Sequence, residues 1–359
     1  MDKSNRTTIT LIALLLLITS CSKEKERNTV PEKFNNELLL KTTPVKNQGK
    51  SSLCWAYAML ATIETEHIMR GDSVNLSVTF LARHLLEDQL EHIYLSHHPT
   101  SNTHHPTPIT TRGMAGDALC LMENYGAMPY DTWHDNADYN LLCRKLQRLA
   151  KTAALHKTGI KKMFDDAEPI MDQQMGAKKG NVYMLGSEYT PLEFAHSLFR
   201  HGEYEALTSF NHHRYGERMT LNVPDNRFGN TMLNVPLDTL EARVIAALRH
   251  GHPVCWEGDT SNSGFSFSKG TAVCHPETIK EGYKVDAEMR QQTFDTRQTT
   301  DDHCMAIVGL AHDKKGILYF ICKNSWGTEN PYHGFIYMSE NYFRMNTLVV
   351  WYSLQENNL

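Results

Sequence analysis

A cysteine that opens an apolar, helix-forming segment is the residue best suited to nucleophilic chemistry in this sequence. Cys54 follows Gln48 and Gly49, and residues 55–70 directly after it have helical periodicity. A thiol at a helix N-terminus faces the positive end of the helix dipole and unpaired backbone N–H groups, which favour the thiolate. The same N–H groups can bind an oxyanion, and the side-chain amide of Gln48 can supply a second donor. The segment therefore predicts a nucleophile and an oxyanion hole within one helical turn.

A general base for this thiol is predicted near the C-terminus. His303 lies at the start of one predicted strand and Asn324 at the end of the next, with a hairpin between them. The hairpin can place one imidazole nitrogen toward Cys54 while Asn324 accepts a hydrogen bond from the other. Trp326 can cover that hydrogen bond and exclude water. The expected site is therefore a Cys-His-Asn arrangement for nucleophilic catalysis.

The elements that must position these residues change character along the chain. Helical periodicity is found at residues 55–70, 80–95, 116–125, 140–157 and 191–199. Strand-like apolar runs are found at residues 253–256, 305–311, 318–323, 335–338 and 348–352. Residues 313–316 have the composition of a hairpin turn. Helices first and strands second favour an α+β fold with a site between the two halves.

Composition excludes several classes of protein. The chain has 359 residues, of which 41% are hydrophobic and 21% charged, so it is not a disordered, collagen-like or coiled-coil chain. Its net charge of −5 argues against a nucleic-acid partner. Eight cysteines without a CxxC pair argue against a disulfide scaffold, a zinc site or a thioredoxin-type site.

Histidines gather between residues 84 and 105, and a metal-binding loop is one interpretation of them. The spacing of nearby carboxylates supports no defined site, so we expect no metal there. The histidines are His84, His92, His97, His98, His104 and His105.

The N-terminus has the pattern of an export signal. Lys3 and Arg6 supply positive charge, and the apolar stretch at 9–18 is shorter than the about 20 residues that span a bilayer. The sequence LITSC at 17–21 resembles the lipobox of bacterial lipoproteins. We therefore expect cleavage before Cys21, a lipid on that cysteine, and a membrane-anchored protein in the bacterial cell envelope. A plain secretory signal with an incidental cysteine is the alternative.

Three motifs, in this order, resemble the signatures of papain-like cysteine peptidases. They are QGKSSLCWA around Cys54, DDHCMAIVG around His303 and KNSWGT around Asn324. Shorter matches along residues 40–352, such as YTPLEF and NVPL, are similar to the bleomycin hydrolase/aminopeptidase C branch of that family. The resemblance implies a papain-like two-lobe fold, in which a helical lobe with a helical insertion packs against an antiparallel β-barrel-like lobe.

The resemblance and the predicted elements together divide the chain into four expected parts. These are a signal peptide at 1–21, a flexible tether at 22–40, a helix-rich lobe with the catalytic cysteine at 41–235, and a β-rich lobe with the catalytic histidine and asparagine at 236–359.

The resemblance also implies roles for the site residues. Cys54 is expected as the nucleophile, His303 as the general acid and base, Asn324 as its orienting partner, and Gln48 with the Cys54 N–H as the oxyanion hole. Acylation of Cys54 would release an amine, and water would then hydrolyse the thioester. The implied substrate is a peptide or protein, and no metal or cofactor is implied. The branch forms a cytosolic hexamer, and whether a lipid-anchored chain is also a homo-oligomer is left open.

Several positions depart from the family pattern. Leu53 replaces the usual Gly or Arg, and Cys304 replaces the alanine that is common in the branch. The Gly-Gly pair that lines the substrate backbone in the family is Arg112-Gly113 here. We expect Gly113, Arg112 and Trp326 to contact substrate, with Arg112 narrowing a subsite or recruiting a carboxylate. For the other cysteines after Cys54 the resemblance favours free thiols, although export permits disulfides.

The end of the chain leaves the type of peptidase open. In the branch a C-terminal arm lies in the cleft and restricts cleavage to N-terminal residues, whereas only residues 353–359 follow the last predicted strand here. We expect thiol-dependent peptide hydrolysis by an aminopeptidase of the bleomycin hydrolase type. An endopeptidase with an open cleft, a non-catalytic peptide-binding lipoprotein, and an enzyme that transfers the acyl group to an amine are the alternatives.

Overall fold

A group of helices and one large mixed sheet make up the part of the chain that the computed structural model describes, residues 33–96, 108–184, 186–274 and 282–354. The helices are α2 (Cys54–Met69), α3 (Val78–Ser96), α4 (Ala115–Tyr125), α5 (Tyr139–Leu155), α6 (Ile160–Met175), α7 (Pro191–Leu198), α8 (Leu237–Arg249), α9 (Ala287–Asp295) and α10 (Glu340–Asn346). The strands are β1 (Asn35–Leu39), β2 (Val182–Met184), β3 (Ser187–Tyr189), β4 (Tyr204–Thr208), β5 (Arg218–Thr220), β6 (Thr231–Asn234), β7 (Val254–Gly258), β8 (Phe265–Ser266), β9 (Thr271–Ala272), β10 (His303–His312), β11 (Leu318–Lys323), β12 (Phe335–Ser339) and β13 (Thr347–Ser353). This arrangement confirms the α+β class.

The predicted helices and strands are all present, with ends that differ by a few residues. Local signals explain several of these ends. α4 stops before Gly126, whose φ of 100° suits a glycine, and α7 begins with a capping box in which Thr190 and Glu193 bond each other's backbone N–H groups. Sequence analysis did not predict α6, α8, α9 or α10. α6 contains Pro169, which is rare in a helix interior and obscures the periodicity.

The large sheet has the strand order β5-β6-β4-β13-β7-β10-β11-β12-β9-β8, and β1 pairs with β10. Most pairs are antiparallel; β4 with β6 and β9 with β12 are parallel. β10 lies centrally, between β7 and β11, and its residues are almost all buried. Its first residue is His303, so the predicted base starts the most constrained strand of the sheet.

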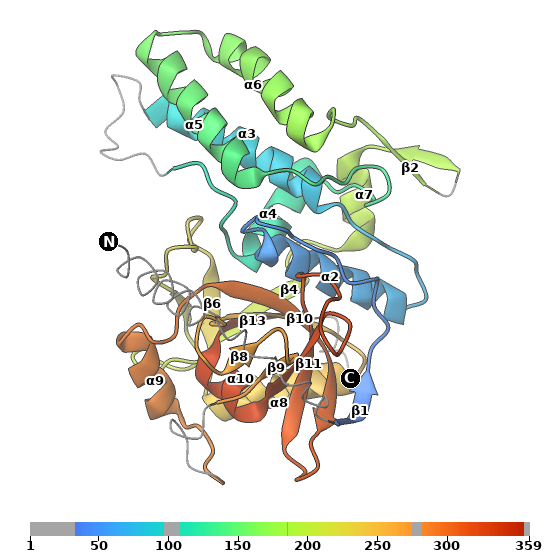
Figure 1. Cartoon of the computed structure of the whole chain (residues 1–359), viewed down its shortest axis with the longest axis vertical. Helices are drawn as coiled ribbons and strands as arrows, with labels where there is room; N and C mark the ends of the chain where they lie inside the picture. The colour runs from blue at the N-terminus through green and yellow to red at the C-terminus, as the bar shows by residue number, and fades with distance from the viewer. Residues whose placement is uncertain (1–32, 97–107, 185, 275–281, 355–359) are drawn as a thin grey trace, which may run out of the picture. The chain divides into compact units, whose positions relative to one another are not determined.

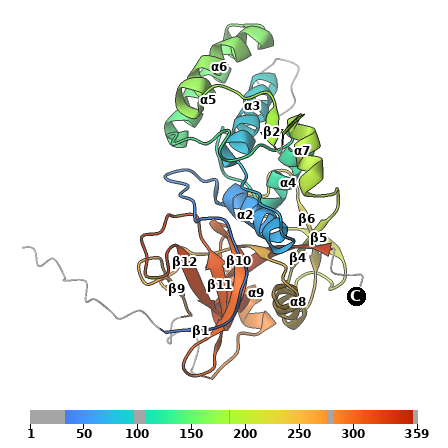
Figure 2. The same cartoon turned by 90° about the vertical axis from the view of Figure 1, so that its right-hand side faces the viewer.

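The helix α2 lies between the sheet and the remaining helices of the N-terminal half (Figures 1 and 2). It contacts α4 on one side and β10 and β7 on the other. Because both sides are covered, α2 is buried around most of its circumference, including the polar residues Thr62, Glu64 and Thr65. α3, α5 and α6 pack on one another as the helical insertion. The N-terminal residue of α2, Cys54, therefore lies where helices and sheet meet.

The expected tether at 22–40 is wrong for its last part. Asn35–Leu39 form β1, which pairs with β10 from Asn35 opposite His312 to Leu39 opposite Gly309. Phe34 stacks on Tyr337 with ring centroids 4.2 Å apart. Sequence analysis missed this short strand, because its partner is distant in the chain: Asn35 pairs with His312, 277 positions later.

Strands from before residue 236 join the same sheet as those after it. β4 pairs with β13, and β6 and β5 extend the sheet from β4. The expected division at residues 235 and 236 thus separates strands that one sheet unites, because β13 at the end of the chain supplies their partner. β13 also includes Ser353, the first residue of the expected tail, whereas residues 355–359 lie outside the described part.

Several sequence-based expectations fall on residues that the structure does not describe. These include the signal peptide with Cys21 and the histidines at 97, 98, 104 and 105. Within the described residues, His84 is buried and stacks on Tyr125 at 4.3 Å, and no group of histidine, cysteine or acidic side chains could hold a metal ion. None of the described helices combines the length and apolar character needed to cross a bilayer.

Candidate active site

Cys54 is the first residue of α2, as predicted. Its own backbone N–H therefore lies in the first turn, where helix N–H groups have no partner within the helix. The preceding Leu53 is almost completely buried in the apolar core of the helical half. This explains the departure at that position, since an apolar side chain there anchors the start of α2. The Cys54 residue is 9% exposed, so its thiol is held in the protein with a small opening to solvent.

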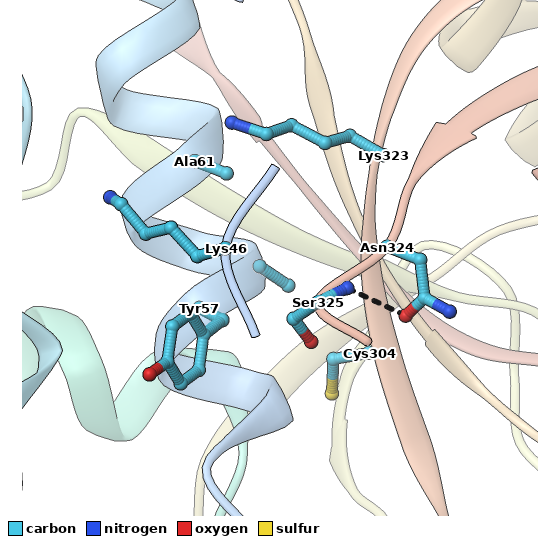
Figure 3. A pocket seen from close by; sticks show the side chains of 8 residues that line it. Lys46, Tyr57, Ala61, Cys304, Lys323, Asn324 and Ser325 are labelled. Carbon is cyan, nitrogen blue, oxygen red and sulfur yellow. Dashed lines mark hydrogen bonds between the residues drawn. The ribbon is translucent and has the colours of Figure 1, made fainter. Parts of the chain in front are cut away.

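His303 and Asn324 are brought together by the pairing of β10 and β11. In that register Ala306 lies opposite Lys323, which places His303 and Asn324 at the same end of the hairpin. His303 Nε2 lies 2.7 Å from Asn324 Oδ1, and both residues are buried. Asn324 Oδ1 also accepts from the backbone N–H of Ser325 at 2.8 Å (Figure 3). Because Nε2 is used by Asn324, Nδ1 is the nitrogen left for the thiol of Cys54.

Trp326 covers this histidine. The two ring centroids are 4.6 Å apart with an angle of 40° between the ring planes. Phe265 and Phe267 pack their edges against Trp326, each at 5.5 Å. These aromatic rings shield the His303–Asn324 hydrogen bond from water, which strengthens it.

Gln48 is fixed beside the start of α2 by residues from both halves of the molecule. Its Nε2 donates to the carbonyl of Ser51 at 2.8 Å, and its Oε1 accepts from the hydroxyl of Ser325 at 2.6 Å. The backbone N–H of Gln48 donates to the Ser325 carbonyl at 2.8 Å. An amide nitrogen has two hydrogens, so Nε2 can donate to Ser51 and to an oxyanion at once.

The electrostatics of the reactive pair favour a thiolate and an imidazolium. The pKa of the Cys54 thiol lies well below its ordinary value, because the neighbouring Cys304 thiol donates a hydrogen bond to it and because His303 adds a hydrogen bond and positive charge. Burial opposes this shift. Burial also lowers the pKa of His303, but the Cys54 thiolate and Asn324 more than compensate, so that pKa is raised. Both shifts act in the direction that cysteine nucleophiles need.

The other described cysteines differ from Cys54 in this respect. All are free thiols, as the resemblance suggested, and burial raises the pKa of each. They are Cys120, Cys143, Cys255, Cys274, Cys304 and Cys322. Cys304, which replaces the alanine common in the branch, contacts Cys54 and so takes part in the electrostatics of the site.

The loop that leads to His303 is held by two carboxylates, of which Asp259 is buried and Asp302 half-buried. Asp302 accepts from the backbone N–H of Thr260 at 2.7 Å, and Asp259 accepts from the backbone N–H of Thr300 at 2.7 Å. Asp302 also makes a small contribution that raises the pKa of His303. Of the two acids before His303, Asp302 is the one that influences the pKa of the imidazole.

Gly113 lies against the start of α2. A Cβ at this position would lie 2.7 Å from Asp117 Oδ2 and 3.1 Å from the Trp55 ring, so only glycine fits. The preceding Thr111 fixes the segment, because its hydroxyl accepts from the Ser52 N–H at 3.0 Å and its carbonyl accepts from Trp55 Nε1 at 2.8 Å. The segment that contains Gly113 thus runs beside Cys54.

Arg112 forms an ion pair with a carboxylate of the same chain, Asp225. Its Nε donates to Asp225 Oδ1 at 2.6 Å, and one of its terminal nitrogens donates to the Asp301 carbonyl at 3.3 Å. The side chain of Arg112 is 44% exposed, whereas that of Asp225 is 13% exposed. Sequence analysis did not single out Asp225, since nothing in its local sequence connects it with a residue 113 positions earlier.

A buried charged network lies behind the reactive pair. Glu64 on α2 accepts hydrogen bonds from Lys46 Nζ and the Leu76 N–H, each at 2.6 Å, and from the Thr43 hydroxyl. Lys323, which precedes Asn324, donates to the same Thr43 hydroxyl at 2.7 Å, and burial lowers its pKa to about 8. Lys46, Lys323 and Asn324 also line a cavity of about 10 Å³ between α2 and β11 (Figure 3).

Glu257 is a second residue that sequence analysis missed. It lies on β7 opposite Cys304, and its Oε1 accepts from Trp351 Nε1 at 2.6 Å and from the Ala115 N–H at 3.1 Å. Burial, with the nearby Asp117 and Cys54, raises the pKa of Glu257 to about 8. An isolated glutamate inside an apolar strand was the only sequence signal for it.

Comparison with known proteins agrees with the fold. The Peptidase C1-like family model matches residues 177–352, a range that includes His303 and Asn324 but not Cys54. Aminopeptidase G of Lactobacillus delbrueckii subsp. lactis is 24% identical over 357 aligned residues, which cover 87% of this chain and 80% of the relative. Cysteine proteinase 1, mitochondrial, of Saccharomyces cerevisiae is 23% identical over 388, covering 91% and 77%. The crystal structure of PepW from Lactobacillus rhamnosis matches with a TM-score of 0.70 at 16% identity, over 98% of this chain and 89% of that one.

Proposed function

We propose that the chain is a papain-like cysteine peptidase of the bleomycin hydrolase/aminopeptidase C branch and that it acts as an aminopeptidase with Cys54, His303 and Asn324 as its catalytic residues. One observation carries the assignment of residues. A thiol of lowered pKa, an imidazole of raised pKa and an asparagine 2.7 Å from that imidazole meet at the N-terminus of α2.

Each of these groups has one task in peptide hydrolysis. The Cys54 thiolate attacks the scissile carbonyl carbon, and the negative charge on the carbonyl oxygen is received by the Cys54 N–H and Gln48 Nε2. His303 gives its proton to the leaving amine, and the acyl group stays on Cys54 as a thioester. His303 then takes a proton from water, which attacks the thioester and releases the acid. Asn324 keeps the imidazole in the orientation that both steps need.

A more specific part of this proposal is that the enzyme prefers substrates with a free N-terminus. Relatives over most of this chain's length are named aminopeptidases, which supports cleavage of N-terminal residues. Action in the bacterial envelope through a lipid on Cys21 is a further part, supported by the LITSC sequence. Mass spectrometry of the N-terminal peptide from membranes tests the anchor, because an unmodified residue 21 would contradict it. The oligomeric state stays a prediction.

A paired reporter assay tests the activity. The purified protein, under reducing conditions, is given an aminoacyl amide reporter with a free α-amine and the same reporter with an acetylated amine. We expect turnover of the first in preference to the second, and no turnover by Cys54→Ala. Cys120→Ala is the matched control, because Cys120 is exposed and its pKa is raised.

Each other outcome has a distinct meaning. Equal or better cleavage of the acetylated reporter would identify an endopeptidase with an open cleft. Absence of turnover by folded wild-type protein would favour a peptide-binding protein. Amide products formed with an added amine would indicate acyl transfer to that amine.

A further inference from the structure

A charged bridge connects the helical side of the active site to its sheet side. Arg112, from the segment beside Cys54, binds Asp225 through its Nε and the Asp301 carbonyl through a terminal nitrogen. Asp225 in turn donates its backbone N–H to Asp301 Oδ2 at 2.8 Å. Asp301 stands two residues before His303, so the bridge joins the neighbours of the nucleophile to the neighbours of the base. We call Arg112, Asp225 and Asp301 the cleft bridge.

The loop that contains Asp225 is held by hydrogen bonds within itself and to neighbouring segments. This loop, residues 221–230, connects β5 to β6. The Asn226 side chain bonds the Leu221 carbonyl and both backbone groups of Asn230, which closes the loop on itself. Asn230 Nδ2 donates to Asp117 Oδ1 on α4 at 2.7 Å, and an Arg227 guanidinium nitrogen lies 3.4 Å from the Pro108 carbonyl. These hydrogen bonds hold the loop in one position, so that it forms one side of the cleft.

The cleft bridge is close enough to the reactive thiol to sense its charge. The Cys54 thiolate contributes to a raised pKa at both Arg112 and Asp225. At the other end, Gln48 and the backbone pairing of Asn47 with Trp326 border the cleft. A substrate residue bound between Cys54 and the cleft bridge therefore meets charged groups.

At this end of the active site, carboxyl groups outnumber guanidinium groups. Three carboxyl groups, Asp117, Asp225 and Asp301, interact with two guanidinium groups, Arg112 and Arg227. Burial raises the pKa of all three carboxyls, to about 6 for Asp117 and Asp225. A carboxyl with a raised pKa is one whose negative charge is poorly compensated, so an incoming ammonium group is stabilised there.

We propose that the cleft bridge closes this end of the active site and that the Asp225 carboxylate receives the α-ammonium group of the substrate's first residue. This inference rests on the proposed aminopeptidase function and names the part of the chain that imposes it. The wall is the 221–230 loop, a segment inside the folded chain. A free ammonium pairs with Asp225, whereas an acylated amine has no charge to offer and its acyl group meets the wall.

The test compares Asp225→Asn with wild-type full-length protein on the free-amine and acetylated reporters. Asparagine keeps the size of the side chain and removes its charge. We expect the ratio of kcat/KM, free amine over acetylated, to fall by roughly 10- to 100-fold, the size of one charge-assisted hydrogen bond, mostly through KM. Glu205→Gln is the matched control, because Glu205 pairs with Arg218 at 2.8 Å with similar exposure but away from the cleft bridge. It should leave the ratio unchanged.

A pH profile of the wild type gives a second readout that needs no variant. The groups that face Asp225 are Arg112, Arg227, Asp117, Asp301 and Cys54. In the ratio of kcat/KM for the two reporters, the titration of Cys54 and His303 cancels, because it affects the cleavage of both substrates. It should fall below about pH 6 as Asp225 is protonated, and above about pH 8 as the substrate amine loses its proton.

The outcomes separate this inference from the proposed function. If wild type prefers the free amine but the ratio is unchanged in Asp225→Asn and flat below pH 6, the cleft bridge is not the ammonium site and the aminopeptidase assignment stands. If wild type has no preference, both proposals fall. If an acetylated lysyl reporter is cleaved far better than an acetylated leucyl one, the site takes a side-chain cation, and the α-ammonium proposal is overturned. Should Asp225→Asn fail to fold, the wild-type pH profile decides.

Discussion

Asn324 Oδ1 lies 2.7 Å from His303 Nε2, although the two residues are 21 positions apart and on different strands. The contact follows from the β10–β11 register, and Trp326 and the buried surroundings shield it from water. A shielded hydrogen bond of this kind fixes the tautomer and direction of the imidazole, which leaves Nδ1 to serve Cys54. The pair is the structural basis for the predictions on activity that follow.

Removal of the orienting amide should lower activity without abolishing it. We expect Asn324→Ala to reduce kcat/KM on the free-amine reporter by roughly 10- to 100-fold, the size of one buried hydrogen bond to a charged group. His303→Ala should be far more damaging, because it removes the proton donor and acceptor. Steady-state kinetics check both. Asn124→Ala, an exposed asparagine on α4, should have no effect. Equal losses in Asn324→Ala and His303→Ala would show that Asn324 does more than orient the imidazole.

Cys304 should set the acid limit of the reaction. Its thiol bonds the Cys54 sulfur and is the largest cause of the lowered Cys54 pKa. Cys304→Ala should therefore raise the pKa of Cys54 and move the acid limb of kcat/KM to higher pH. The alkaline limb, set by the raised pKa of His303, should move less. Cys322→Ala, which removes another buried thiol, is the control. An unchanged acid limb in Cys304→Ala would contradict this part of the account.

Glu257 should make stability depend on pH. Its pKa is about 8 in the folded protein and near 4.5 when unfolded, so between these values the folded state binds one more proton. The stabilisation is therefore complete below about pH 4.5 and is lost as pH rises through 8, at roughly 1.4 kcal/mol per pH unit. Glu257→Gln keeps the acceptor for Trp351 and cannot ionise. Denaturant unfolding at pH 5 and pH 8 should show it gaining stability relative to wild type as pH rises. A constant difference would contradict the raised pKa.

Glu64 should matter more for stability than any exposed carboxylate. It is fully buried and is the acceptor for Lys46, Thr43 and the Leu76 N–H. Glu64→Gln leaves Lys46, whose side chain is only 12% exposed, without its counter-charge, which should cost about 3–5 kcal/mol of unfolding free energy. Glu37→Gln breaks the exposed pair with Arg249 and should cost less than about 1 kcal/mol. Urea unfolding compares the two, and losses of equal size would show that the buried network does not carry this stability.

Local sequence patterns predicted the reactive pair because its chemistry lies in short motifs. Cys54 is the first residue of a helix. His303 and Asn324 flank one hairpin, and the hairpin spacing brings these two residues near each other. The segment before Cys54 also predicted Gln48 as a second oxyanion donor. The pairing of β1 with β10 and of β4 with β13 could not be predicted, because each strand is short and its partner is distant in sequence.

The residues that surround the reactive pair were hidden for the same reason. Asp225 meets Arg112 across 113 positions, and Glu257 meets Ala115 across 142. Neither partner has a motif, since a carboxylate in a loop or strand has many ordinary roles. The sequence left open whether Arg112 narrows a subsite or recruits a carboxylate, and it did not identify Asp225 as a partner.

Selective alkylation of Cys54 tests the central claim most directly. The protein is treated with iodoacetamide at pH 6, and the labelled cysteine is identified by peptide mapping in wild type and in His303→Ala. Among the described cysteines Cys54 alone has a lowered pKa. We predict rapid labelling at Cys54 in wild type and much slower labelling in His303→Ala. Labelling of Cys54 no faster than of Cys120, or unaffected by loss of His303, would contradict a thiolate–imidazolium nucleophile.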